Sequence, residues 1–168
     1  KRGTDYTWTD ASAVPFADTN ISSFVFGDSV EYIPARLCTR MSKLTSITIP
    51  KNITSIGDEA FYKSALDTVI WEAKNCTIGT SVFKDLKIST FILGDKMEYI
   101  PASLCSGMNV TSVVIPSSVI GVGNNPFPNL ISVFIKATSV DDYFQRKINQ
   151  LLYNSGVKDA MRTLLINE

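Results

Sequence analysis

The chain has 168 residues, of which 45% are hydrophobic and 19% charged, and its 16 basic and 16 acidic residues cancel. This composition is typical of a folded protein rather than a disordered one. No basic run follows the pattern of a phosphate-binding surface, and no apolar stretch approaches the roughly 20 residues of a membrane helix. We therefore expect neither a nucleic-acid partner nor a direct membrane span. A first residue of Lys1 rather than Met is typical of a trimmed or excised chain.

The residue types also argue against catalysis. Histidine is absent, which removes the commonest general base and the commonest metal ligand. Acidic residues are scattered, and the pairs Asp28/Glu31 and Asp95/Glu98 are expected in solvated turns rather than facing each other across a cleft. We predict a protein that is not an enzyme and that carries no cofactor and no metal.

Residues 1–20 match no repeated pattern, whereas residues 21–136 contain six copies of one template. The copies begin at Ile21, Leu44, Leu66, Ile88, Val110 and Leu130, which are 23, 22, 22, 22 and 20 residues apart. We number these copies coils one to six. Tyr6, Trp8, Val14 and Phe16 are predicted to cover coil one as an N-terminal cap.

Each copy opens with the pattern Leu-x-x-Ile-x-Ile, whose closing alternation predicts a short strand with one buried face. A later apolar run, such as Ile53 to Ile56, returns the chain along the other side, and a pair such as Ala60-Phe61 fills the corner. One coil cannot bury its own faces, so the coils should stack and their strands should form a parallel sheet.

A longer similarity indicates that a block of three coils is duplicated. FVFGDSVEYIPARLCTRM from Phe24 recurs as FILGDKMEYIPASLCSGM from Phe91, and LTSITIP from Leu44 recurs as VTSVVIP from Val110. Pro50 and Pro116 directly follow two of the expected strands. Because proline cannot donate to a sheet ladder, these strands should end there.

The three cysteines are expected to pack rather than react. Cys38 and Cys105 occupy the corner position of Phe61 and should be buried. They lie three coils apart, or about 14 Å at about 4.8 Å per strand, which is too far for a disulfide. Cys76 aligns with Thr54, a position that we predict to lie nearer the surface.

Residues 137–168 change period and predict a helical C-terminal cap. Ser139 with Asp142 resembles a capping box, and Gly156 marks a stop. The apolar residues at helical spacing between them are Val140, Tyr143, Phe144, Ile148, Leu151 and Leu152. The stretch 157–166 then fits either a short helix or a last strand.

The string IP-x-x-I-T-S-IG-x-x-AF at 49–61 resembles the signature of BspA-like leucine-rich repeats of the bacterial surface type. The resemblance implies an α/β class, β-rich, right-handed solenoid that makes the whole chain, 1–168, one leucine-rich-repeat domain. It also implies a secreted or cell-surface protein whose relatives adhere to host or matrix proteins. Two departures, Ala65 where the family often has Cys and Leu-Cys in place of Ala-Phe in coils one and four, are interpreted as packing variants.

The strand face away from the core is the candidate binding site. One outward row is mostly apolar, and its neighbour carries hydroxyls at Ser23, Ser46, Thr68, Thr90, Ser112 and Ser132. The apolar row reflects either β-propensity alone or a contiguous interaction stripe. We predict that a protein ligand binds this face, which should be concave, through Val25, Thr48, Ile70, Ile92, Val114 and Phe134. Two alternatives remain, a structural spacer in a larger surface protein and a carbohydrate-binding module that uses Tyr32, Tyr99 and the hydroxyls.

Overall fold

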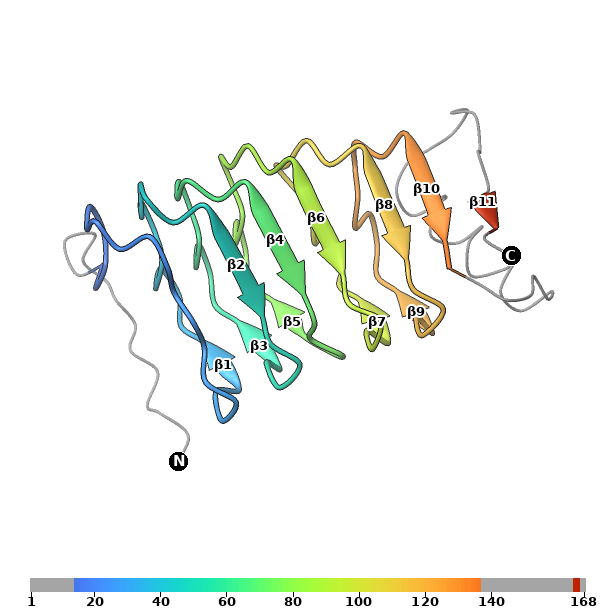
Figure 1. Cartoon of the computed structure of the whole chain (residues 1–168), viewed down its shortest axis with the longest axis horizontal. Helices are drawn as coiled ribbons and strands as arrows, with labels where there is room; N and C mark the ends of the chain where they lie inside the picture. The colour runs from blue at the N-terminus through green and yellow to red at the C-terminus, as the bar shows by residue number, and fades with distance from the viewer. Residues whose placement is uncertain (1–13, 137–164, 167–168) are drawn as a thin grey trace.

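The alternation of apolar and polar residues produces a four-residue strand in each of five successive coils. The computed structural model describes residues 14–136 and 165–166. These strands are β2 Ser46–Ile49, β4 Thr68–Trp71, β6 Thr90–Leu93, β8 Ser112–Ile115 and β10 Ser132–Ile135. In each strand the second and fourth residues are buried, and the strands lie side by side in a solenoid of about five turns (Figure 1). The predicted strands and their buried faces are confirmed in coils two to six, whereas coil one forms no strand over 21–26.

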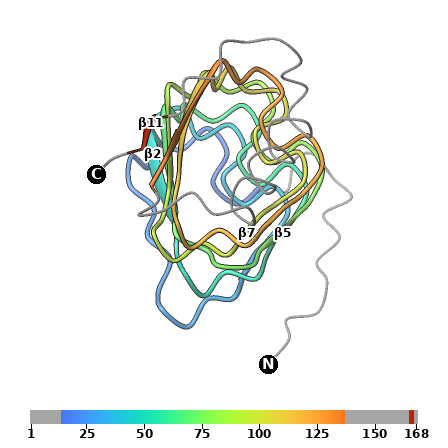
Figure 2. The same ribbon diagram turned by 90° about the vertical axis from the view of Figure 1, so that its right-hand side faces the viewer.

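A second set of strands returns the chain along the other side of each coil. These two-residue strands are β1 Tyr32–Ile33, β3 Ser55–Ile56, β5 Thr77–Ile78, β7 Tyr99–Ile100 and β9 Gly121–Val122. Seen along the stack, the coils superpose as one loop, with β2 on one side and β5 and β7 on the other (Figure 2). The apolar side chains of both sets therefore point into a shared interior.

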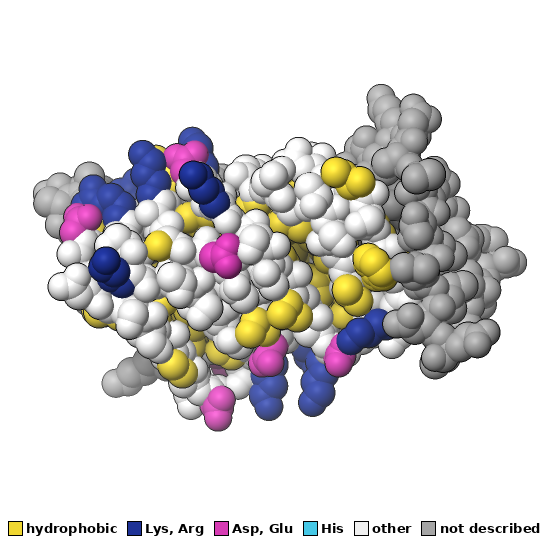
Figure 3. Space-filling model, turned by 45° about the horizontal axis from the view of Figure 1, so that its top comes forward, with side chains coloured by type: hydrophobic (Ala, Val, Ile, Leu, Met, Phe, Trp, Pro, Cys, Tyr) yellow, Lys and Arg dark blue, Asp and Glu magenta, His cyan; other side chains and the backbone are white. Residues whose placement is uncertain are grey.

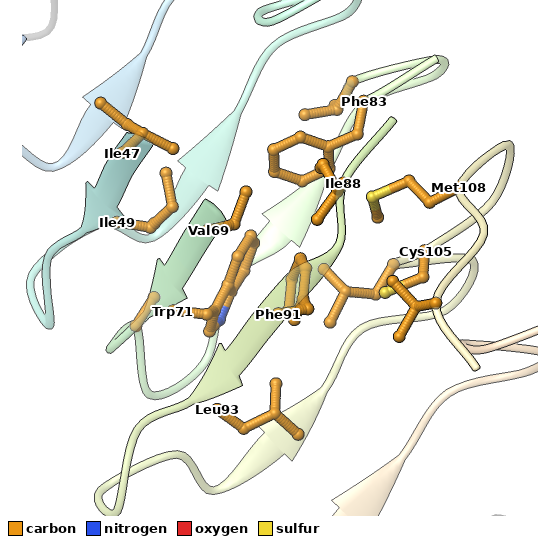
Figure 4. Packing of buried hydrophobic residues seen from close by; sticks show 14 of the residues in the cluster. Ile47, Ile49, Val69, Trp71, Phe83, Ile88, Phe91, Leu93, Cys105 and Met108 are labelled. Atoms are coloured by element: carbon orange, nitrogen blue, oxygen red, sulfur yellow. The ribbon is translucent and has the colours of Figure 1, made fainter. Parts of the chain in front are cut away.

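The interior is filled by large apolar side chains from neighbouring coils. Trp71 and Phe91 stack at 6.3 Å between ring centroids (Figure 4). Phe61 stacks on Phe83 at 5.4 Å with ring planes 4° apart. Cys38 and Cys105 are fully buried at the corner, as predicted, and all three cysteines are free thiols. Because each ring contacts the coil beside it, the core belongs to the stack rather than to single coils.

The prediction that Cys76 lies near the surface is wrong, since its side chain is 4% exposed. Asn75 stands where coil two has the buried Ile53, and its polar side chain is exposed and donates to Glu98 Oε2 at 3.1 Å. The inward position of this turn therefore moves one residue along the chain to Cys76.

Prolines divide the long-strand sheet into two pieces, β2-β4-β6 and β8-β10-β11. At paired junctions the residue after the strand donates its N–H to the preceding coil, as Glu72 does to the Ile49 carbonyl at 2.9 Å and Gly94 to the Trp71 carbonyl at 2.7 Å. Pro50 and Pro116 occupy the same position and have no N–H. They end β2 and β8, as predicted, and the ladder towards the preceding coil is missing at both.

The short-strand sheet is divided in the same way, into β1-β3-β5 and β7-β9. Gly57, Gly79 and Gly123 each donate to the preceding coil at 2.8 Å. Pro101 takes this position in coil four, and β7 does not pair with β5. Prolines at equivalent positions thus account for the divisions of both sheets.

The expected caps fall largely outside the described residues. Tyr6, Trp8 and residues 137–164 belong to that part of the chain, so the predicted helical cap is not supported, and residues 14–136 and 165–166 contain no helix. Leu165–Ile166 forms β11, which pairs in parallel with β10 and agrees with the strand alternative for 157–166. Phe16 packs on the core and meets Phe24 edge-on at 5.4 Å, and an N-terminal cap over coil one stays a prediction.

Candidate ligand-binding face

The third residues of the long strands form one continuous row, which we call the strand-face row. Thr48 pairs with Ile70 and Ile70 with Ile92, while Val114 pairs with Phe134. Strands β6 and β8 are neighbours although no ladder joins them, so the row continues across the gap. Five strands at about 4.8 Å spacing give the row a length of about 19 Å.

Most of the apolar members of this row are exposed. Ile92, Val114 and Phe134 are 46%, 43% and 38% exposed, Ile70 is half-buried and Thr48 is exposed. Val25 is 84% exposed but lies outside any strand, because Pro50 leaves coil one unpaired with β2. The structure therefore brings five of the six predicted residues together and places Val25 beside the row.

Sequence reasoning missed Ile131, whose side chain is 64% exposed just before β10. The equivalent positions in coils two to five are polar, namely Thr45, Asp67, Ser89 and Thr111. An isoleucine at a position that is polar in the other coils could have identified this site from the sequence. Together with Val114 and Phe134 it enlarges the apolar surface on coils five and six, and hydrophobic side chains are visible towards that end of the face (Figure 3).

Polar groups surround the apolar row on both sides. The predicted hydroxyl row, exposed or half-buried, lies at the starts of the long strands, and charged residues follow the strand ends. Lys136 reaches past coil five to Asp95, with Nζ 3.1 Å from Oδ1. A shallow hollow of about 380 Å³ lies among Lys51, Glu72 and Lys96. An apolar centre within a polar rim is the usual arrangement of a protein-binding surface.

The two tyrosines of the carbohydrate hypothesis are not brought together. Tyr32 and Tyr99 lie on β1 and β7, three coils apart, on the short-strand side. The Tyr99 ring covers Gly121, where an added Cβ would lie 2.8 Å from the ring, and the Tyr32 hydroxyl lies beside Gly57 in the same manner. Each tyrosine therefore packs on the glycine of the following coil, and the pair does not form an aromatic platform.

The titratable groups of the described chain are arranged for packing and solvation. Burial raises the pKa of Cys38 and of Cys76 to about 12, and that of Cys105 well above the ordinary 9.0, which keeps these thiols protonated and poorly nucleophilic. Hydrogen bonds from Lys74 and Asn75 lower the pKa of Glu98. Within residues 14–136 and 165–166, no three Cys, Asp or Glu side chains gather as a metal site. No helix in that same part of the chain has the length and apolar character to cross a bilayer.

Comparison with known proteins identifies the repeat. The family described as BspA type leucine rich repeat region matches six copies over residues 10–133. No curated protein and no solved structure matches the chain. The match covers well over half of the sequence and includes the whole strand-face row except Phe134.

Proposed function

Since the chain belongs to the BspA-type leucine-rich-repeat family, we propose that it is a recognition module, secreted or at the cell surface, that binds a host or matrix protein. The strand face is the proposed contact, with Ile70, Ile92, Val114 and Phe134 at its centre. The observation that carries this proposal is the register of these side chains, which lie on successive strands and are largely exposed.

The shape and chemistry of the row favour a protein over a small ligand. A small molecule is usually held in a concave pocket that buries most of its surface, whereas this row lies on an open sheet face. A contiguous apolar stripe bordered by polar groups suits a partner surface of matching shape. Phe134 is the best anchor, because aromatic side chains contribute most strongly to protein interfaces.

The test is binding of the purified chain to a panel of extracellular-matrix and plasma proteins, with the double variant Ile92→Asp/Phe134→Asp measured beside it. Two desolvated carboxylates at the centre of the contact should weaken binding by at least roughly a hundredfold. The matched control is Ile120→Asp, because Ile120 is 61% exposed but lies off the strand face. This variant should bind like the unmodified chain.

Circular dichroism should show that all three proteins are equally folded. Unchanged affinity in the folded double variant would place the contact elsewhere on the molecule. If no protein in the panel binds, the proposed function fails and the spacer interpretation is favoured instead.

A further inference from the structure

One junction between coils has lost its corner hydrogen bonds. Between coils two and three, the N–H groups of Glu59, Phe61 and Lys63 donate to carbonyls of the following coil at 2.9, 3.0 and 3.3 Å. The equivalent groups one junction later are the N–H of residues 81, 83 and 85 and the carbonyls of residues 102, 104 and 106. None of these six groups has a partner in the described chain.

A cavity lies between these two rows of unpaired groups. Its volume is about 650 Å³, and its walls are residues 78–84 of coil three and residues 102–104, 106 and 107 of coil four, with Asp58 at one side. We call this cavity the seam. Coil three presents N–H donors to it and coil four presents carbonyl acceptors. Hydroxyls of Thr80, Ser81, Ser103 and Ser106 belong to the same walls, and Phe83 and Leu104 supply apolar surface.

Pro101 explains why the coils separate here. At Gly57, Gly79 and Gly123 the preceding coil packs so closely that an added Cβ would lie within 3.0 Å of its backbone. Pro101 occupies the equivalent position in coil four, where its ring fills that space and its nitrogen cannot donate. Corner bonds are present at the junctions that carry glycine, including Ser103 N–H to the Asn124 carbonyl at 3.0 Å.

We propose that the seam is a binding site for a neutral sugar ring, separate from the strand face. A hydroxyl group accepts one hydrogen bond and donates another, so a single sugar hydroxyl bridges an N–H of coil three to a carbonyl of coil four. Several hydroxyls on one ring satisfy several of the facing groups, while the apolar parts of Phe83 and Leu104 contact C–H groups. The volume lies within the usual range for small-ligand sites.

Other ligand classes match these walls less well. An anion would meet the carbonyl row of coil four and the carboxylate of Asp58, which accepts from Thr80 N at 2.6 Å and Thr80 Oγ1 at 3.0 Å. A cation would face the N–H row of coil three. An extended peptide does not present its N–H groups along one edge and its carbonyls along the other, because residues alternate in direction. The paired rows therefore select groups that both donate and accept.

The test is a titration of the ¹⁵N-labelled chain with glucose, galactose, mannose and N-acetylglucosamine, each as the free sugar and as the methyl glycoside. A ligand in the seam should shift the amide signals of Ser81, Phe83 and Asp85 in a saturable way at millimolar concentration. Binding of methyl glycosides would indicate that the site accepts a sugar within a glycan chain. Binding of free sugars alone would indicate a soluble sugar.

Two variants locate the site. Ser106→Tyr should fill the seam without unfolding the chain, because coil two carries Tyr62 at the equivalent position. Pro101→Gly should restore the missing donor and close the seam, with a rise in Tm as a separate readout. Each should weaken sugar binding by at least roughly tenfold.

The matched controls are Ser117→Tyr, an exposed serine away from the seam, and Pro34→Gly, the equivalent proline of coil one. Both should bind like the unmodified chain. Absence of saturable shifts with every sugar, or binding that survives both Ser106→Tyr and Pro101→Gly, overturns the proposal. Either result leaves the protein-binding test of the strand face unaffected.

Discussion

Two neighbouring corners of the solenoid differ in closure although the same repeat builds both. One lies between coils two and three, and the other lies between coils three and four. The first has three backbone hydrogen bonds and a stacked pair, Phe61 on Phe83. The second has no corner bonds in the described chain and borders the seam, which Phe83 and Leu104 line. Corner size is not the cause, because Cys38 N–H bonds to the Ala60 carbonyl at 2.7 Å in a closed junction that also carries a cysteine.

One position decides whether neighbouring coils close. Where the residue after the short strand is glycine, the preceding backbone approaches within 3.0 Å of the site that a Cβ would occupy. Where it is Pro101, the coils part. On the long-strand side, Pro50 and Pro116 interrupt pairing in a similar way. Coil four therefore pairs with coil three through the long strands β6 and β4, and with coil five through the short strands β7 and β9.

The largest effect should come from breaking the core of the closed region. Ile49 on β2 is fully buried, so Ile49→Asp places an unpaired carboxylate in the interior and should destabilise the stack by about 4 kcal/mol or more. Thr48→Asp, one residue away on the exposed face, should change stability by no more than about 0.5 kcal/mol. Urea unfolding followed by circular dichroism measures both. Similar unfolding midpoints for the two variants would contradict the assigned faces of β2.

The next effect comes from opening a closed corner. Gly57→Ala inserts a Cβ against the backbone of Ala35, and the resulting separation of coils one and two should destabilise the fold by about 1–3 kcal/mol. Gly27→Ala is the matched control, because nothing lies within 4 Å of the added Cβ. Thermal unfolding should separate the two variants clearly. Equal melting temperatures would show that close approach at this glycine position is not what closes the corner.

Much of this framework could be predicted from the sequence because the repeat is strict. Coil starts, buried strand positions and the ends of β2 and β8 follow from period and from proline chemistry, and register then places the strand-face row. The burial of Cys76 could not be read in this way, because a one-residue shift around Asn75 depends on how the turn packs. The seam could not be predicted either. In the sequence Pro101 only repeats Pro34, and its effect depends on the close contact of Gly57, Gly79 and Gly123 with the backbone of the preceding coil, which only the structure shows.

A smaller effect concerns backbone strain in the corner of coil four. Ser103 and Gly107 have φ angles of 55° and 81°, a region that side chains with a Cβ disfavour. Gly107→Ala should destabilise the chain by about 1 kcal/mol, since its Cβ would meet Lys84 only at an ordinary 3.7 Å and the effect is conformational. Ser103→Gly should stabilise it by about 0.5 kcal/mol, because relief of strain slightly exceeds the added entropy of glycine. The midpoints of denaturant unfolding should shift in opposite directions for the two variants. Shifts in the same direction would contradict the backbone conformation assigned to these residues.

The smallest effect distinguishes the closed corner between coils one and two from the open corner between coils three and four, by local opening rather than by global stability. Cys38 and Cys105 are equivalent and fully buried, but the coil of Cys105 borders the seam. We compare two variants, each of which retains one of these cysteines and has the other two changed to Ala. Each thiol should react with a thiol reagent only when its corner opens. Cys105 should react faster, because fewer hydrogen bonds hold its corner closed.

The same thiols make the free energy of unfolding depend on pH in the alkaline range. Folding raises the pKa of Cys38 from 9.0 to about 12, so the unfolded chain loses its thiol proton first as the pH rises. The contribution of Cys38 to stability should therefore be constant below about pH 9 and be lost as the pH rises above it, so the alkaline loss of stability should be smaller when Cys38 is also changed to Ala. If Cys38 instead reacted faster than Cys105, the corner between coils one and two would be the weaker one, and the missing hydrogen bonds at the seam would not govern how the stack opens.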